Sequence, residues 1–158
     1  MFGMILYHGS NVEIVEVDIS KSRVGKDFGC GFYLTPDYNI ALNQARRRSD
    51  LEGGVPVVNM YEVDEDLMKS LNVKTFVGYS VSWALFVKKN RANRSRNQIH
   101  DFDMVVGTIA DDDIGLQMRK LNDGRISLDD FMKALQWKRV TIQYFFGTEN
   151  ALKILRKI

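Results

Sequence analysis

The sequence predicts an α+β fold in which two packed, mostly antiparallel, curved sheets are flanked by helices. Three observations lead to this prediction. Short apolar or alternating runs, typical of strands, recur along the chain. Amphipathic runs that begin at N-capping residues, typical of helices, separate some of these strands but not others. Because strands and helices interleave irregularly, the regular βαβ alternation of a parallel sheet is not expected.

The predicted strands are short and apolar or alternating. The first, Met4–Tyr7, ends at His8, one of two histidines in the chain. Val57–Val63 shows the clearest alternation of side chains, as expected for a strand with one buried face. The other predicted strands are Gly31–Leu34, Val73–Val77, Phe102–Ile109 and Arg139–Phe146.

The predicted helices each begin at a hydroxyl side chain that can act as N-cap. Thr35 is followed by Pro36 at the first helical position, and this helix is expected to end near Ser49. Ser127 with Asp130 resembles a capping box. The other two starts are Ser80, for a helix to about Asn90, and Thr148, for a helix with Ala151, Leu152 and Leu155 facing inward.

The segments between these elements are predicted to be loops. Residues 11–22 are expected to be irregular or extended, and residues 90–101 form a polar, basic loop. Residues 64–70 are expected to form a turn of helix. Residues 25–31 hold three glycines, which permit positive φ and close backbone approach, so we expect a turn packed against a ligand.

Length and composition are those of one globular domain spanning residues 1–158. The chain is 45% hydrophobic and 27% charged, and its net charge of +2 does not favour nucleic acid as a partner. Basic residues cluster locally at 46–48, 88–89 and 91–96, where solvated helix ends and an anionic partner both remain open.

Cysteine content and the absence of a long apolar run indicate a cytoplasmic protein with no membrane partner. Cys30 is the only cysteine, so neither an intramolecular disulfide nor a cysteine-based zinc site is possible. Residues 123–131 look like the second half of an EF-hand loop. Calcium would need oxygen ligands at Arg119 and Leu121, so we expect no metal.

Two motifs carry a resemblance to a known family. The sequence His8-Gly9-Ser10, followed by Phe28-Gly29-Cys30-Gly31-Phe32-Tyr33, resembles the histidine and tyrosine motifs of ADP-ribosyltransferases of the diphtheria-toxin and poly(ADP-ribose) polymerase type. The whole chain also resembles a small, poorly characterised bacterial family of that superfamily. The residues that carry this second resemblance are Trp83, Asn90-Arg91, Gly107, Ala110-Asp111-Asp112, Gln143, Phe146, Thr148 and Ala151-Leu152.

The resemblance implies an ADP-ribosyltransferase-like fold and a glycosyltransferase that uses NAD as substrate. Such an enzyme breaks the nicotinamide–ribose bond and transfers a single ADP-ribose unit to a macromolecular acceptor, either protein or nucleic acid. A small stand-alone bacterial version implies a toxin or effector, held by a small antitoxin protein.

The resemblance also assigns roles to residues of the two motifs. His8 would hydrogen-bond a ribose hydroxyl of the adenosine half, and Ser10 would contact the other ribose. The backbone of Gly9 would pair with the nicotinamide amide, and Tyr33 would stack on the positively charged nicotinamide ring. The NAD-binding residues would be His8, Gly9, Ser10, Gly31, Phe32 and Tyr33, and the catalytic residues His8, Tyr33 and Gln143.

The chain departs from the family pattern at the third catalytic position. A glutamate is expected at the start of a late strand, where Gln143 stands. An amide can bind a ribose hydroxyl but carries no charge, and a unit charge at about 4 Å contributes roughly 4 kcal/mol at an effective dielectric of about 20. Transfer is therefore expected to be slow, limited to single units, or dependent on a base in the substrate. Glu149 is the other candidate for the acidic role. Alternatively, Glu149 is only a carboxylate at a helix start, where it interacts favourably with the helix dipole.

Two other functions remain open on the sequence. The first is a binding module that keeps the fold without the chemistry and recognises ADP-ribose, an RNA end or a protein. The second is phosphate transfer from RNA, which would need arginines in the pocket, and Arg23 and residues 91–96 are the candidates.

Overall fold

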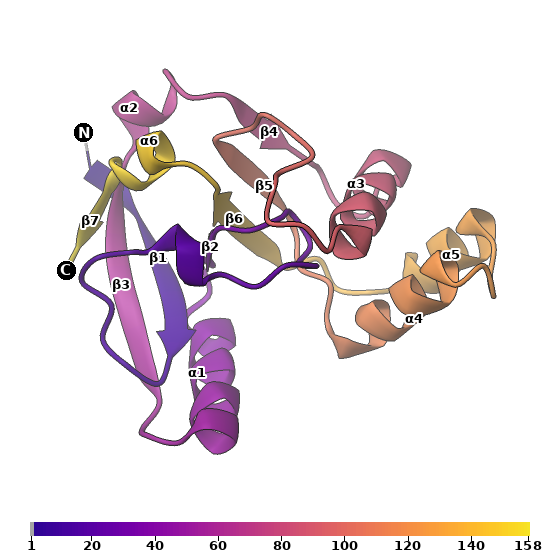
Figure 1. Ribbon diagram of the computed structural model, residues 1–158, viewed down its shortest axis with the longest axis horizontal. Helices are drawn as coiled ribbons and strands as arrows, with labels where there is room; N and C mark the ends of the chain where they lie inside the picture. Colours follow the sequence, from indigo (N-terminus) through magenta and orange to yellow (C-terminus); the bar gives the residue numbers. More distant parts are fainter. Residues whose placement is uncertain (1) are drawn as a thin grey trace.

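The computed structural model describes residues 2–158, with side chains from residue 3 onward, and arranges them around two sheets (Figure 1). Sheet A has the strand order β1-β3-β7, and sheet B the order β2-β6-β5-β4. All the strand pairs are antiparallel except β4 with β5. The strands are β1 (Phe2–Ser10), β2 (Phe32–Leu34), β3 (Val57–Asp64), β4 (Val73–Thr75), β5 (Met104–Thr108), β6 (Ile142–Phe146) and β7 (Leu155–Lys157).

The prediction of an α+β fold with two mostly antiparallel sheets and flanking helices is confirmed at that level. Residues 2–158 form six α-helices, together with a 3₁₀ turn at Ile19–Lys21. The helices are α1 (Tyr38–Glu52), α2 (Glu65–Met68), α3 (Val81–Ala92), α4 (Asp112–Asn122), α5 (Leu128–Leu135) and α6 (Glu149–Leu152).

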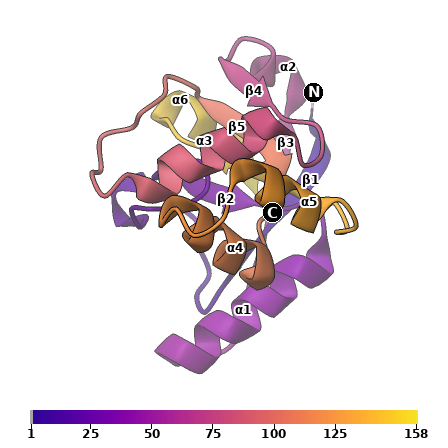
Figure 2. The same ribbon diagram turned by 90° about the vertical axis from the view of Figure 1, so that its right-hand side faces the viewer.

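Sheet B lies between two hydrophobic cores. One of its faces contributes Val105 and Phe145 to a core shared with α3, α4 and α5, which lie together on that side of the molecule (Figure 2). The opposite face contributes Phe32 and Phe146 to a second core, shared with β1, β3 and α6. Alternating side chains of each strand thus serve two different cores, as the period of a strand requires.

Backbone hydrogen bonds also join the two sheets near the histidine and tyrosine motifs. Tyr7 and Thr35 exchange backbone hydrogen bonds of 2.8 and 2.9 Å, which tie β1 to the end of β2. The histidine motif on β1 and the tyrosine motif on β2 are therefore held side by side by the sheet architecture.

The helix starts at Ser80, Ser127 and Thr148 are confirmed, because each of these hydroxyls accepts a backbone N–H from the first turn. The Ser127–Asp130 capping box forms with both of its hydrogen bonds. Each of these three signals depends on residues within one turn of each other, and the hydroxyl keeps its capping role in the folded protein.

The predicted start of the first helix is wrong by two residues. Asp37, not Thr35, caps α1, and its carboxylate accepts the backbone N–H groups of Asn39 and Ile40. Thr35 is buried and donates its hydroxyl to the carbonyl oxygen of Ile142 at 3.2 Å. The threonine side chain is therefore committed to joining β2 to β6.

Two further elements differ from the prediction. The last helix ends at Leu152 after one turn, and Leu155 belongs to strand β7, which pairs with β3. Helix α4 was missing from the prediction, and it places Arg119 and Leu121 inside a helix, where the EF-hand comparison had put loop positions.

None of the helices in residues 2–158 is long and apolar enough to cross a membrane.

Candidate functional site

A cavity of about 400 Å³ lies where the two predicted motifs meet. His8 and Ser10 of β1 line it, together with residues 31–33 at β2. Residues 11–19, which follow β1, form another part of its wall. The structure thus brings together five of the residues proposed to bind NAD, and the volume lies within the roughly 300–1,000 Å³ of small-molecule sites.

The imidazole of His8 is held in one orientation. Its Nδ1 lies 2.7 Å from the carbonyl oxygen of Tyr33, and its ring packs on Phe32 with centroids 4.4 Å apart. Because a carbonyl oxygen only accepts, Nδ1 carries the proton, and Nε2 is left as an acceptor. The pKa of His8 is lowered to about 4, mainly by burial and further by the nearby Lys26 and Arg48, so the ring is neutral at physiological pH.

The phenol of Tyr33 is part of the protein's own packing. Its hydroxyl donates to the carbonyl oxygen of Gly29 at 2.6 Å and accepts the backbone N–H of Phe28 at 3.0 Å. Its ring packs on Phe28 and Phe145. Burial and the neighbouring Asp27 raise the pKa of Tyr33 well above its usual value, so the hydroxyl stays protonated.

The glycines of the two motifs are required by the protein's own backbone packing. A Cβ added to Gly9 would lie 2.0 Å from the carbonyl oxygen of Ala41 in α1. A Cβ on Gly31 would meet the Phe145 ring and the carbonyl oxygen of Phe146 on β6. Neither glycine has a positive φ. The turn that we expected between residues 25 and 31 does use positive φ, at Gly25 and Gly29.

Four basic side chains border the cavity: Lys21, Arg23, Lys26 and Arg48. The Lys26 ammonium lies 5.0 Å from the centroid of the Tyr33 ring, a cation–π contact. No carboxylate in residues 3–158 forms an ion pair with Lys26. The pKa of Lys26 is lowered, mainly because the surrounding protein displaces water from its ammonium. The positive charges of Arg23, Arg48 and Arg91 lower it further, and the negative charge of Asp27 opposes the fall.

Three carboxylates also line the cavity, those of Glu13, Glu16 and Asp18. Because Glu52 forms ion pairs with Arg23 and Arg48, an anionic ligand is favoured mainly beside Lys21 and Lys26.

The cavity wall is pinned to sheet A on one side. Asn59 of β3 accepts the backbone N–H of Ile14 at 2.8 Å and donates to the carbonyl oxygen of Val12 at 3.0 Å. The Tyr61 hydroxyl donates to the carbonyl oxygen of Ile14 at 2.6 Å. Residues 12–14, expected to be irregular, are therefore fixed by side chains of a neighbouring strand.

The segment after α3 holds the other side of the wall. Arg96 donates to the carbonyl oxygens of Ile19, Ser20 and Ser22, and Gln98 donates to that of Cys30. His100 Nε2 lies 2.7 Å from the carbonyl oxygen of Phe28. Much of the basic loop at 91–96 therefore serves the fold, which weakens the interpretation of those arginines as an RNA site.

Gln143, the third predicted catalytic residue, lies on β6 next to β2 but does not line the cavity. Its Nε2 donates to Asp27 Oδ2 at 3.1 Å and is 3.4 Å from the carbonyl oxygen of Thr108. Asp27 Oδ1 in turn accepts from Arg91 Nε at 2.6 Å. A buried network of arginine, aspartate and glutamine thus lies beside Tyr33.

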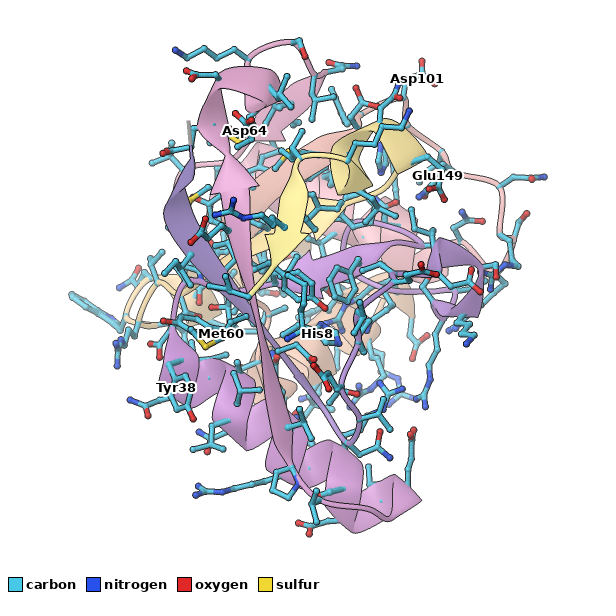
Figure 3. All side chains as sticks on the ribbon, turned by 90° about the vertical axis from the view of Figure 1, so that its left-hand side faces the viewer. His8, Tyr38, Met60, Asp64, Asp101 and Glu149 are labelled. Atoms are coloured by element: carbon cyan, nitrogen blue, oxygen red, sulfur yellow. The ribbon has the colours of Figure 1, made fainter. Side chains whose placement is uncertain are left out.

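Glu149, the rival acid, lies elsewhere. It occupies the first turn of α6 and lines a separate hollow of about 230 Å³ that shares Val15, Glu16 and Val17 with the main cavity. Figure 3 labels both residues and shows Glu149 well separated from His8. Its position agrees with a carboxylate that answers the helix dipole.

Replacing Glu149 by glutamine is expected to lower the free energy of unfolding by about 1 kcal/mol or less, because only a favourable dipole interaction in the first turn of α6 is lost. Chemical denaturation of the two proteins measures this. Nicotinamide release from NAD by the variant should match that of the wild type. A loss of release without a loss of stability would return the catalytic role to Glu149.

Two residues of the site had no sequence signal. Lys26 and Asp27 stood in the glycine-rich turn as ordinary polar residues, and nothing in the motif pattern pointed to them. Asp27 meets a glutamine 116 positions away along the chain, so only the tertiary structure reveals the pair.

Comparison with known proteins adds a family but no function. A family model described as "Protein of unknown function (DUF3990)" matches residues 4–156. No curated protein matches the chain, and no solved structure matches it.

Proposed function

Since the chain belongs to the DUF3990 family, whose function is unknown, its activity is inferred from the cavity, and we propose that it is an NAD-dependent mono-ADP-ribosyltransferase. The observation that carries this proposal is the single cavity lined by His8, Ser10, Gly31, Phe32 and Tyr33. Two short motifs that resemble those of ADP-ribosyltransferases, separated along the chain, converge there. Two lysines that line the cavity, Lys21 and Lys26, suit the pyrophosphate of NAD.

The geometry of His8 supports a role in holding a ribose. With Nδ1 committed to the Tyr33 carbonyl, the neutral ring presents Nε2 as an acceptor for a ribose hydroxyl. The half-buried, neutral imidazole adds no positive charge beside a ribose that becomes oxocarbenium-like when nicotinamide leaves. Ser10, on the same face of β1, offers a hydroxyl to the same ligand.

Lys26 has a specific place in this proposal. Its ammonium lies over the ring of Tyr33, where the cationic nicotinamide would stack. Two cations on one ring face repel each other, so NAD binding requires the Lys26 side chain to swing away. Its flexible four-carbon stem permits this, and the phosphates of NAD offer the ammonium a new partner.

Binding of NAD is the first consequence to test. NAD at about 100 times its dissociation constant should add roughly 2.7 kcal/mol to the free energy of unfolding. For a chain of this size that corresponds to a rise of roughly 5 to 10 °C in Tm. Thermal unfolding with NAD, NADH and ADP-ribose measures it. No shift with any of them at millimolar concentration would remove NAD and ADP-ribose as ligands.

The reaction itself is tested with NAD labelled in its adenylate part. Incubation with a cell lysate should transfer label to a protein or nucleic acid and release nicotinamide. The acceptor, a cytoplasmic location, a toxin or effector role and a small antitoxin partner belong to the same proposal. Each follows from the resemblance to the bacterial family, and the labelled acceptor is the most direct route to them.

A binding module on the same fold is the second candidate. The amide of Gln143 is occupied by Asp27 and Thr108, and a cation covers Tyr33, which favours recognition of ADP-ribose without chemistry. A thermal shift with ADP-ribose together with no nicotinamide release would favour this candidate.

A further inference from the structure

The proposed reaction needs a negative charge near the ribose, and Gln143 supplies none. The structure places a carboxylate beside it: Asp27 Oδ2 accepts from Gln143 Nε2 at 3.1 Å. The Asp27 side chain is only 12% exposed. The acid that the strand position lacks is thus present on the neighbouring loop, in contact with the amide that stands in its place.

Asp27 does not line the cavity itself, but both of its neighbours in the chain contact Tyr33, which does. It follows Lys26, whose ammonium lies over the Tyr33 ring, and it precedes Phe28, whose backbone N–H donates to the Tyr33 hydroxyl. Its charge acts on both of these neighbours, opposing the fall in the pKa of Lys26 and contributing to the rise in that of Tyr33. Asp27 therefore lies next to the ring on which nicotinamide would stack.

On these contacts, and resting on the proposed function, we propose that Asp27 supplies the negative charge that the ribose needs and that Gln143 is the positioning residue that holds its carboxylate.

The partners of Asp27 hold its carboxylate in one orientation. Arg91 Nε binds Oδ1 and Gln143 Nε2 binds Oδ2, so each oxygen has a donor. The orientation of the amide is fixed as well, because Asp27 and the Thr108 carbonyl can only accept, so the nitrogen of Gln143 faces both. A glutamine suits this place, since a glutamate would have no proton to donate to Asp27.

Asp27 contributes only its negative charge to the proposed reaction. The bond between the ribose C1′ and the nicotinamide nitrogen breaks, and its electron pair leaves with neutral nicotinamide. The positive charge moves onto the ribose, where the carboxylate of Asp27 stabilises it without forming a bond. The acceptor then bonds to C1′ and loses its proton, or water does so in the hydrolysis of NAD.

An exchange of the two side chains tests the pair. The proteins are the wild type, Asp27→Asn, Gln143→Glu and the double variant that carries both changes. Nicotinamide release gives kcat and KM for each, and thermal unfolding reports the fold. In Asp27→Asn, kcat should fall by about 10²- to 10³-fold with little change in KM, because charge is lost from the transition state.

The double variant separates catalysis from structure. In Gln143→Glu two carboxylates face each other, so we expect it to be less stable and no faster than the wild type. The double variant restores one amide and one carboxylate, and kcat should recover about tenfold over Asp27→Asn. If Asp27→Asn is too unstable to assay, this recovered pair still carries the test.

Two results overturn the proposal. The first is an Asp27→Asn variant that releases nicotinamide at the wild-type rate, and the second is a double variant that is stable but no faster than Asp27→Asn. A wild-type protein that releases no nicotinamide overturns the proposed function, and the role of Asp27 with it. If the wild type releases nicotinamide and Asp27→Asn does so at the same rate, only the role of Asp27 is overturned and the proposed function stands.

Discussion

Gly9→Ala is expected to destabilise the protein by about 3 kcal/mol or more, the upper end of the usual cost of overpacking. The added Cβ would lie 2.0 Å from the Ala41 carbonyl oxygen and 2.7 Å from the Ala45 backbone nitrogen. Both atoms belong to the backbone of α1, so no side chain can turn aside, and the helix must move off sheet A. Thermal unfolding should show Tm lower by roughly 6 to 12 °C.

Gly115→Ala provides the matched control. Gly115 lies in α4, where its added Cβ would lie 3.2 Å from the Arg91 guanidinium, a contact that a small shift of that side chain relieves. Alanine is also the better helix former by roughly 0.5–1 kcal/mol. Its Tm should stay the same or rise. A Gly9→Ala variant that unfolds like the wild type but no longer binds NAD would mean that the ligand, and not α1, requires the glycine.

Tyr33→Ala is expected to abolish nicotinamide release and also to destabilise the protein by about 3 kcal/mol, as for other large-to-small changes of aromatic side chains. The family resemblance assigns this ring to stacking on nicotinamide. The structure packs that ring against Phe28 and Phe145, so its removal leaves a cavity beside the core of sheet B. Activity is therefore measured below the Tm of the variant.

Tyr33→Phe separates the ring from its hydroxyl. The phenylalanine keeps the stacking surface and loses two hydrogen bonds, those with Phe28 and Gly29. Because the backbone groups of both residues are left unpaired, about 1–3 kcal/mol of stability should be lost while release of nicotinamide continues. Release at the wild-type rate by a folded Tyr33→Ala protein would disprove the pocket assignment.

The parts of the fold that could be predicted are those with local signals. Hydroxyl caps at Ser80 and Ser127 and the alternation of Val57–Val63 depend on neighbours within a few residues, and the structure has all three elements. Helix α4 had such a signal in the spacing of Ile114, Met118 and Leu121, but the prediction did not include this helix.

The parts that could not be predicted depend on distant partners. Strand β7 has three residues and exists because β3 offers it an edge. Thr35 is drawn from its capping role by a carbonyl 107 positions away. In the candidate site the His8 and Tyr33 motifs could be paired from the sequence. The contact of Asp27 with Gln143 has no local pattern, because a buried polar pair is defined only when the sheet has formed.

Strand β6 is synthesised after the two strands between which it lies in sheet B, so the sheet cannot assemble in the order in which its strands are made. Residues 142–146 lie between β2 and β5, so both strands wait for a partner that the ribosome delivers late (Figure 1). At about 5 to 20 residues per second, β2 stays without its neighbour for roughly 5 to 20 s after it emerges. An unfinished chain thus exposes unpaired strand edges, to which chaperones can bind. It also lacks the contact between Asp27 and Gln143, because Gln143 is made late.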